Sequence, residues 1–438
     1  MERALQAELE NWKNSSVRLP LIIQGARQVG KTYLMKWFGQ HHFEKFAYFN
    51  FDERPELNDF FTSNKDVNRI IDSLSLISGT LIDANTLLIF DEIQECPEAL
   101  NTLKYFAEKR PEIPIICAGS LLGITLNPGS SFPVGKVSFL TLHPFTFREI
   151  LPYWNDKLSV YLNRLNSTDP LPDYFYNDLL DQFKRYLVTG GMPAVLNIFK
   201  QERSFEACES MLHNLILSYQ GDFAKYPVMS DVAKIGQVFN SLPAQLAREN
   251  KKFVYQLIRS GARAREYEDA IQWLVLSGLV HQVKLISKPS VPLSAYDDES
   301  AFKLYALDVG IMRKMAKLSP LAYMEGSRLF TEFKGAMIEN YILQSLVTQF
   351  EVTPRYWTSG NIAEVDFLIQ YHNQIIPIEV KSDENVKSRS LSEFHRKYQP
   401  KLRIRYSLKN LSYRDGLLNI PHFMSDYTWE LLKRIAHE

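Results

Sequence analysis

Short apolar runs alternate with helical patterns over the first third of the chain. Four of these runs, each bounded by turn residues, read LPLIIQG, FAYFNF, TLLIFDE and IPIICAGS. Continuous apolar runs of this length are typical of strands that are buried on both faces of a parallel sheet. Helices between such strands connect them in an α/β layer fold. The pattern therefore predicts an α/β domain with a parallel sheet at residues 1–150.

The pattern changes after residue 150. Aromatic-rich helical segments run through residue 229, and the sequence TGGMP at residues 189–193 interrupts them. Glycine and proline at these positions would end a helix, because proline lacks a backbone donor and glycine has the freest backbone. We expect a helical lid at residues 151–229.

Residues 230–310 predict three helical segments followed by two strands, LVHQVKLIS and AFKLYAL, around a proline-containing loop. This order of elements is that of a winged helix, which would read DNA. A small α+β packing unit has the same order, so the pattern leaves both interpretations open. At residues 311–438 a helix containing Glu339 precedes a hairpin, and we expect a further α/β unit there.

Composition adds little about partners. Lys plus Arg and Asp plus Glu number 50 each, so net charge favours neither nucleic acid nor an acidic surface. The three cysteines are scattered and odd in number, which is typical of free thiols in a reducing compartment. The N-terminus lacks a signal-peptide pattern, and no run approaches the ~18 apolar residues of a membrane span. We expect a cytoplasmic protein that does not contact membranes.

A glycine-rich loop follows the first predicted strand. It fits the pattern G-x-x-x-x-G-K-[ST] and consists of Gly25, Ala26, Arg27, Gln28, Val29, Gly30, Lys31 and Thr32. Such a loop wraps its backbone N–H groups around a polyphosphate, and the N-terminus of the next helix adds a partial positive charge. Lys31 would bridge the β and γ phosphates of ATP, and Thr32 would bind Mg²⁺. The alternative is an ordinary β-α turn.

A second apolar strand, LLIFDE at residues 87–92, ends in two carboxylates. We expect Asp91 to hold Mg²⁺ and Glu92 to polarise the water that attacks the γ phosphate. Without the glycine-rich loop, the same strand end would read as a helix cap. Ser120, after the strand IPIICAG, would contact the γ phosphate or the water, or else cap a helix.

Nearly the whole chain resembles a family of bacterial and archaeal AAA-type ATPases that carry a C-terminal domain of unknown function. The resemblance rests on GARQVGKT, LLIFDEIQ, AGSLLG, SFPVGKV with PFTFREI, TGGMPAV, ARAREYEDAIQWLVLSGLV, and IENYI with EVDFLI and IPIEVKS. It implies an AAA-like core whose hydrolytic site is completed by an arginine from the lid or from a neighbouring subunit. Arg263 and Arg265 are the candidates. Many relatives have Gly-Arg where this chain has Gly135-Lys136, which leaves open whether a homo-oligomer supplies an arginine or a lysine in trans.

Charged side chains alternate along the predicted C-terminal hairpin. In NIAEVDFLIQY, Glu364 and Asp366 share one face, and in QIIPIEVKS, Glu379 and Lys381 share one face. An even number of loop residues near residues 372–373 would place Asp366 opposite Glu379, whereas an odd, unbulged loop would separate them onto different faces.

Glu339 lies on the apolar stripe of its helix, where a carboxylate needs a partner. Together with Asp366, Glu379 and Lys381 it resembles the PD-(D/E)XK nuclease core. That resemblance implies a restriction-nuclease-like α/β domain in which two carboxylates hold Mg²⁺ and a lysine activates water. The alternative is a solvated hairpin with a cross-strand lysine–carboxylate pair.

A basic stretch interleaved with aromatic residues follows the hairpin. Its basic members are Lys387, Arg389, Arg396, Lys397, Lys401, Arg403 and Arg405, and its aromatic members are Phe394, His395, Tyr398 and Tyr406. This mixture suits phosphate contact and base stacking, although a solvated edge strand and helix would look the same.

Three functions are consistent with these features. The first is an ATPase switch that gates a C-terminal nuclease-like or DNA-binding module. The second is an ATP-regulated, metal-dependent DNA nuclease. The third is a nonenzymatic DNA- or protein-binding adaptor that keeps the hairpin as a scaffold.

Overall fold

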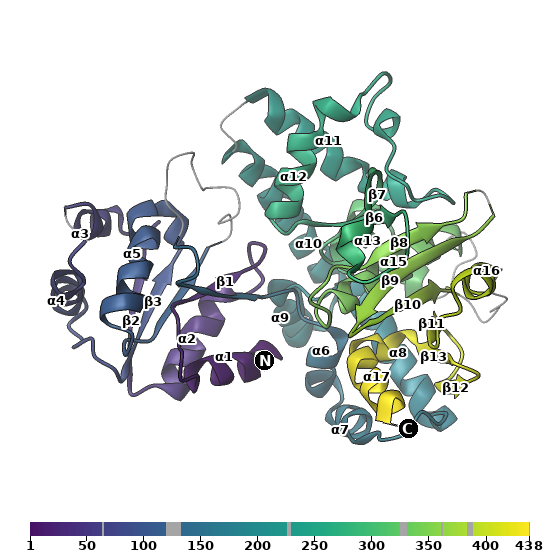
Figure 1. Cartoon of the computed structure of the whole chain (residues 1–438), viewed down its shortest axis with the longest axis horizontal. Coiled ribbons are helices and arrows are strands. Elements are labelled where there is room, and N and C mark those ends of the chain that lie inside the picture. Colours follow the sequence, from purple (N-terminus) through teal and green to yellow (C-terminus); the bar gives the residue numbers. More distant parts are fainter. Residues whose placement is uncertain are drawn as a thin grey trace. The chain divides into compact units, whose positions relative to one another are not determined.

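The computed structural model describes residues 1–63, 65–119, 133–225, 229–324, 331–360, 362–382 and 389–437. The chain divides into two compact units (Figure 1). The N-terminal unit holds residues 2–143 with 276–278, and the C-terminal unit holds Met1, residues 144–275 and residues 279–438. Within the described ranges, no helix is both long enough and apolar enough to cross a membrane.

The N-terminal unit is built on a five-stranded parallel sheet. Its strands are β1 (Leu21–Gln24), β2 (Lys45–Asn50), β3 (Thr86–Asp91), β4 (Ile115–Ala118) and β5 (Ser138–Thr141). Their order across the sheet is β2-β3-β4-β1-β5. The four apolar runs are thus confirmed as parallel strands, and this is the α/β arrangement of a P-loop fold.

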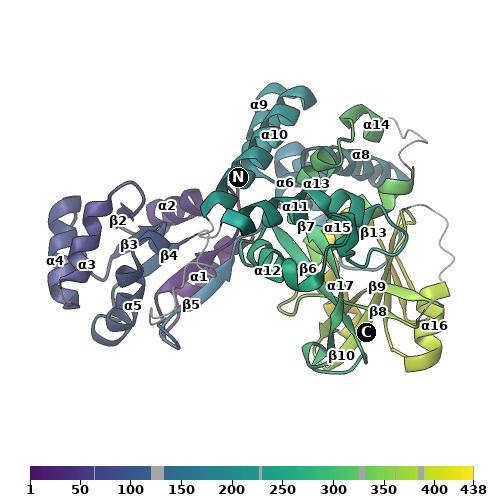
Figure 2. The same cartoon turned by 90° about the horizontal axis from the view of Figure 1, so that it is seen from above.

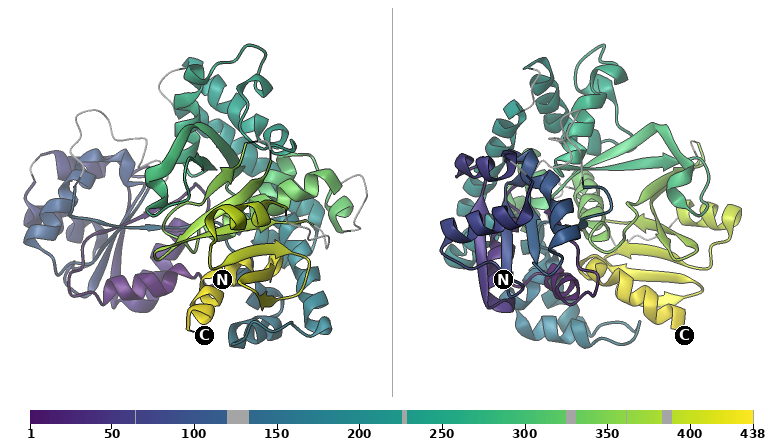
Figure 3. Two further views of the ribbon diagram at one scale, coloured as in Figure 1. Left: turned by 45° about the vertical axis from the view of Figure 1, so that its right-hand side comes forward. Right: turned by 60° about the vertical axis from the view of Figure 1, so that its left-hand side comes forward.

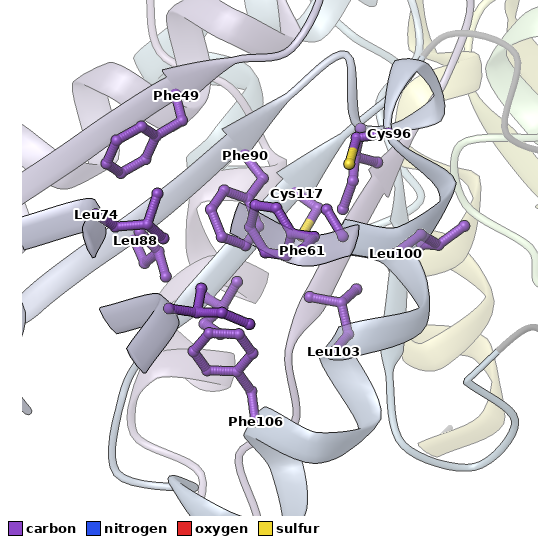
Figure 4. Packing of buried hydrophobic residues seen from close by; sticks show 14 of the residues in the cluster. Phe49, Phe61, Leu74, Leu88, Phe90, Cys96, Leu100, Leu103, Phe106 and Cys117 are labelled. Atoms are coloured by element: carbon purple, nitrogen blue, oxygen red, sulfur yellow. The ribbon is translucent and has the colours of Figure 1, made fainter. Parts of the chain in front are cut away.

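Helices cover both faces of this sheet. They are α1 (Leu5–Lys13), α2 (Lys31–His42), α3 (Asp59–Thr62), α4 (Val67–Ser78) and α5 (Pro97–Lys109). Alternate strand residues face opposite sides, so Leu88 and Phe90 of β3 join one apolar core with Phe61, Leu74 and Leu103 from α3, α4 and α5 (Figure 4). Helix α2 packs against β2, β3 and β4.

The C-terminal unit begins with a run of helices, and two further short helices follow its first two strands. These helices are α6 (Phe147–Trp154), α7 (Asp156–Arg164), α8 (Asp173–Thr189), α9 (Pro193–Glu202), α10 (Phe205–Asp222), α11 (Met229–Leu246), α12 (Glu268–Leu276), α13 (Val309–Met315) and α14 (Pro320–Met324). The break predicted between residues 189 and 193 is confirmed, because α8 ends at Thr189 and α9 begins at Pro193.

An eight-stranded sheet forms the core of the C-terminal unit. Its strands are β6 (Val280–Ile286), β7 (Asp297–Ala306), β8 (Arg355–Thr358), β9 (Glu364–Tyr371), β10 (Gln374–Val380), β11 (Arg403–Ser407), β12 (Ser412–Arg414) and β13 (Leu417–Pro421). The order is β12-β13-β11-β10-β9-β8-β6-β7. Figure 3 shows the green β6–β7 ribbon continuing the yellow-green C-terminal strands.

The β6–β7 ribbon differs from the sequence-based expectation in one respect. It does not stand apart with the preceding helices, because Leu285 of β6 pairs with Tyr356 of β8 and so joins the ribbon to the C-terminal sheet. Long-range strand pairing of this kind leaves no local signal in the sequence. The winged-helix interpretation stays a prediction.

Three helices accompany the last strands. Helix α15 (Thr331–Leu346) contacts β7 and β10, α16 (Arg389–Tyr398) contacts β9 and β10, and α17 (Thr428–His437) closes the described chain (Figure 2). Strands β9 and β10 are antiparallel and are joined by a two-residue loop at 372–373. The hairpin predicted after the helix that contains Glu339 is therefore confirmed. Strand β8 lies between this helix and the hairpin in the sequence.

Candidate functional site

The glycine-rich loop joins the end of β1 to the start of α2. Gly25 has a φ of 139°, and a Cβ atom there would lie 2.2 Å from the carbonyl oxygen of Leu142. Gly30 has a φ of 99°, which favours glycine over residues with side chains. The two glycines therefore allow the turns that a phosphate-binding loop needs, and Gly25 also allows the close approach of residue 142.

Lys31 is the first residue of α2 and is only 7% exposed. Its Nζ donates hydrogen bonds of 2.8 Å to the carbonyl oxygens of Gly25 and Ala26, so the ammonium group lies inside the loop. Burial lowers the pKa of Lys31 to about 8, although the negative charges of Glu92 and Asp91 oppose this shift.

Asp91 ends β3 beside Thr32. The Thr32 hydroxyl donates to Asp91 Oδ2 at 2.6 Å, and the Tyr48 hydroxyl donates to the same oxygen at 2.9 Å. Asp91 is 2% exposed, so these two bonds and the backbone N–H of Glu92 at 3.1 Å hold its orientation. Two oxygen ligands suited to Mg²⁺ thus lie within hydrogen-bond distance of each other, which fits the predicted metal role.

Glu92 follows directly in the left-handed backbone region, with a φ of 49°. Its Oε2 accepts a hydrogen bond of 2.5 Å from Nε2 of Gln94, a side chain that is 6% exposed. A residue other than glycine in this region is strained, and such strain is often found at functional sites. The hydrogen bond from Gln94 holds the Glu92 carboxylate at this turn.

For three other residues, only the sequence supports a place in the nucleotide site. Ser120 lies outside the described residues. Arg263 and Arg265 lie at an exposed 3₁₀ turn (Ala264–Glu266) that precedes α12, and not on a helix as expected. The role of either arginine in hydrolysis stays a prediction.

The β9–β10 hairpin loop has an even number of residues, so the register places Asp366 and Glu379 at facing positions. The pairs Tyr371↔Gln374 and Phe367↔Ile378 make Asp366 and Glu379 the next facing pair. Asp366 Oδ2 accepts a 2.7 Å hydrogen bond from the backbone N–H of Val380. Lys381 Nζ lies 3.0 Å from Glu379 Oε1, so the lysine and the glutamate share a face as expected.

Glu339 is only 2% exposed, so its carboxylate needs partners inside the protein. Three residues provide them. Its carboxylate pairs with Lys251, accepts a hydrogen bond from Tyr305, and lies 3.6 Å from Lys303 Nζ. Lys303 is itself fully buried and lies 2.5 Å from Glu364. We call Lys251, Lys303, Tyr305, Glu339, Glu364 and Asp366 the buried charge cluster.

Charge balance in the buried charge cluster sets the ionisation of its carboxyl groups. Burial works to raise the pKa of Glu339, but the charges of Lys251 and Lys303 outweigh it and lower that pKa. Burial and the negative charge of Glu339 raise the pKa of Asp366. The lysine charges therefore favour the ionised form of Glu339, whereas Asp366 beside it is harder to ionise than an exposed aspartate.

These residues fit a metal ion only in part. Glu379 is 2% exposed, and its Oε2 has no hydrogen-bond partner among the described residues, so the facing pair Asp366 and Glu379 could hold a cation. Glu339 is engaged by Lys251, Lys303 and Tyr305. In the part of the chain that the structure describes, no three His, Cys, Asp or Glu side chains are grouped to hold a metal ion.

The basic and aromatic stretch is partly buried and partly exposed. Phe394 and Tyr406 are buried, so neither ring can stack on a base, contrary to the expectation from the sequence. Arg396 and Lys397 pair with Glu393. Tyr398 is 41% exposed and remains available. Lys387 lies outside the described residues.

Several residues of these sites were not identified from the sequence. Tyr48 lies at the centre of strand FAYFNF, a position with no local signal. Gln94 ends the motif LLIFDEIQ, but no role in the site was assigned to it from the sequence. Lys303 does carry one, because it is a charged residue inside the apolar run AFKLYAL. Lys251 reaches Glu339 across 88 positions of the chain, a distance that no spacing rule covers.

Three family models match separate parts of the chain. Residues 17–151 match a model described as an AAA domain. Residues 180–322 and 334–423 match two models described as domains of unknown function (DUF8612 and DUF4143). No curated protein matches the chain.

Three similar solved structures come from archaea and a bacterium. The Walker-type ATPase PABY2304 of Pyrococcus abyssi has 15% identity and a TM-score of 0.46, over 71% of this chain and 95% of that one. The RuvB Holliday junction branch migration motor of Thermotoga maritima has 13% identity and a TM-score of 0.28, over 63% and 86%. Cdc6p from Pyrobaculum aerophilum has 13% identity and a TM-score of 0.23, over 74% and 92%.

Proposed function

We propose that this AAA-type P-loop ATPase binds magnesium-ATP at the end of β1 and β3, hydrolyses it, and uses the nucleotide state to control its C-terminal unit. The observation that carries the proposal is the convergence of Lys31, Thr32 and Asp91. They come from two elements separated by 59 positions, yet the Thr32 hydroxyl lies 2.6 Å from Asp91. A β-α turn without a ligand has no need of this arrangement.

Each residue has a defined task in this proposal. The backbone N–H groups of residues 25–32 and the N-terminus of α2 bind the phosphates. When ATP binds, the Lys31 ammonium group would leave the carbonyl oxygens of Gly25 and Ala26 and bind phosphate oxygens. Its positive charge therefore already lies in the loop before the nucleotide arrives. Thr32 and Asp91 would hold Mg²⁺, which neutralises charge on the β and γ phosphates when bound.

Glu92 is the general base of the proposed hydrolysis. Its carboxylate follows Asp91 directly and would orient the attacking water and accept its proton. The hydrogen bond from Gln94 fixes the carboxylate before the reaction. A fixed carboxylate loses less entropy at the moment of reaction than a mobile one.

Close packing and hydrogen bonds connect the glycine-rich loop to residues 142 and 143. Gly25 lies against Leu142, whose backbone N–H donates to Gln24 at 2.8 Å. Arg3 is buried and donates to the carbonyl oxygens of both Val29 and His143. The N-terminal unit ends at residue 143, so a shift of the loop on nucleotide exchange would move the segment that leads into the C-terminal unit.

The affinity for ATP should fall as the pH rises above about 8. The pKa of Lys31 in the free protein is about 8, and ATP binds the protonated form. Below that pH the group is already charged, so affinity is constant; above it, binding must recruit a proton and weakens by up to about tenfold per pH unit. Tyr48 does not titrate in this window, because burial and Asp91 raise its pKa.

A titration of a fluorescent ATP analogue in the presence of Mg²⁺, from about pH 7 to about pH 9.5, measures this dependence. The control is Lys31→Arg, whose guanidinium stays charged throughout. It should give a flatter profile than the wild type, whatever its absolute affinity. A wild-type profile that is flat across pH 8 would contradict the role given to Lys31.

The C-terminal unit has two candidate roles. We favour a nucleic-acid-binding module, in keeping with the exposed basic residues of α16. The alternative is a metal-dependent nuclease. It is supported by the register that places Asp366 opposite Glu379 and by Glu379 Oε2, which has no hydrogen-bond partner among the described residues. In that alternative Asp366 and Glu379 would hold the cation and Lys381 would assist the attacking water, whereas Glu339 is occupied by lysines.

One experiment separates these roles. Labelled single- and double-stranded DNA is incubated with the protein in Mg²⁺ or Mn²⁺, with and without ATP, while phosphate release is followed in the same tubes. Phosphate release with nucleotide-dependent DNA retention and no cleavage is the expected result. Cleavage that Asp366→Asn abolishes, and that the exposed turn variant Asp415→Asn retains, would establish the nuclease instead. If neither phosphate release nor cleavage occurred, the remaining candidate function would be a nonenzymatic adaptor.

A further inference from the structure

A cavity of about 540 Å³ lies at the tip of the β9–β10 hairpin, remote in sequence from the nucleotide site. Its walls come from three segments: residues 289–291, the hairpin residues 373–375, and the end of α16 with residues 400–401. The volume is in the range of small-ligand sites, although the lining of this cavity is more polar than apolar. Ile375, Phe394 and Pro400 supply the apolar surface here.

Tyr398 forms an aromatic wall of this cavity. It is 41% exposed, although two neighbours hold its ring. Trp357 meets the ring edge-on at 5.6 Å and 85°, and Phe394 lies at 4.8 Å. Trp357 and Phe394 are both buried, so the Tyr398 ring is fixed while part of it faces the cavity. A flat aromatic surface that is already ordered can stack on a planar ligand at little entropic cost.

The polar groups of the cavity have a consistent character. Asn373 and Gln374 are exposed at the hairpin turn, and each amide can both donate and accept hydrogen bonds. Lys401 is exposed beside them, and the described residues that line the cavity include no Asp or Glu. The site therefore combines a stacking ring, two amides and a positive charge, without a negative side chain to repel phosphate.

We infer that this cavity binds an unstacked base of single-stranded nucleic acid. The inference rests on the nucleic-acid-binding role proposed for the C-terminal unit, and it names the ligand and the residues. Tyr398 stacks on the base, Asn373 and Gln374 contact its edge, and Lys401 binds an adjoining phosphate. A duplex keeps its bases paired and stacked, so it cannot place one in the cavity without local opening.

Fluorescence anisotropy with a labelled oligothymidylate tests this inference on the full-length protein. Tyr398→Ala should weaken single-strand binding by about fivefold or more, whereas Tyr398→Phe, which keeps the ring, should stay within about twofold of the wild type. Lys401→Ala should lower the slope of log affinity against log salt by about 0.7, the value for one phosphate contact on a single strand.

The matched control is Tyr174→Ala, which removes a tyrosine that is 77% exposed on α8 and does not line the cavity. All variants should keep the wild-type rate of phosphate release. Tyr398→Ala loses ring contacts with Trp357 and Phe394, so its melting temperature is measured to confirm that binding is compared at a temperature where the variant is folded. If the wild type binds the single strand and Tyr398→Ala binds it equally well, the inference is wrong while the nucleic-acid role stands. If the wild type binds no nucleic acid, both are wrong.

Discussion

Lys31→Ala is expected to weaken the binding of magnesium-ATP by about 100-fold or more. The buried ammonium of Lys31 supplies the only lysine charge within residues 25–32 and is held in the loop by Gly25 and Ala26. Its removal takes away the buried ammonium group that would bind the phosphate oxygens. Equilibrium binding of a fluorescent ATP analogue in Mg²⁺ measures the loss.

Lys45→Ala is the matched control for this variant. Lys45 is exposed and begins β2, at the opposite end of the parallel strands from the loop. Its replacement should leave the affinity unchanged. Because Lys31 is buried, the melting temperature of Lys31→Ala is measured alongside; a folded variant that still binds ATP with wild-type affinity would overturn the proposed site.

Glu92→Gln is expected to separate binding from turnover. The amide cannot accept a proton from the attacking water, so phosphate release should fall by about 10²- to 10⁴-fold, while ATP affinity changes little because Lys31, Thr32 and Asp91 remain. Single-turnover phosphate release and equilibrium binding on the same preparation measure the two effects.

Glu95→Gln makes the same chemical change three residues away, at an exposed position of the same short turn. It should hydrolyse ATP at the wild-type rate. If Glu92→Gln also turned over normally, the general base would have to be another residue, and the strained backbone at Glu92 would need a different explanation.

The strand, loop and helix around the proposed nucleotide site could be predicted from the sequence because their signals are local. Glycines at fixed spacing, an apolar strand before them and a helix after them all lie within residues 19–42, and the strand ending in Asp91 is an uninterrupted apolar run. Parallel strands bring such ends to one edge of the sheet. From the sequence, Asp366 and Glu379 were expected to face each other only if the hairpin loop had an even number of residues. The loop has two residues, so this condition is met.

Other features depend on contacts between distant segments. The joining of β6 to β8 through Leu285 and Tyr356 spans about 70 residues, and periodicity within a strand cannot indicate its neighbour. In the same way, the position of Glu339 on the apolar stripe of its helix indicated that a partner was needed but could not identify Lys251 or Lys303. The aromatic residues of α16 and β11 also looked alike in sequence, although the fold buries Phe394 and leaves Tyr398 exposed.

The buried charge cluster shows why a resemblance in spacing does not establish an activity. Glu339, Asp366, Glu379 and Lys381 occur in the order of a nuclease core, yet Lys251 and Lys303 neutralise Glu339 within the protein. Removal of one partner from such a buried pair leaves an uncompensated charge, which is strongly destabilising. The lysines thus give Glu339 a structural role that requires no metal.

The central claim is that the loop at residues 25–32 closes around the triphosphate beside Asp91. A crystal structure of Glu92→Gln soaked with magnesium-ATP tests it most directly. We predict that Lys31 Nζ leaves the carbonyl oxygens of Gly25 and Ala26 for the β and γ phosphates, with Mg²⁺ on the Thr32 hydroxyl near Asp91. Nucleotide bound elsewhere, with Lys31 still on those two carbonyl oxygens, would contradict the claim.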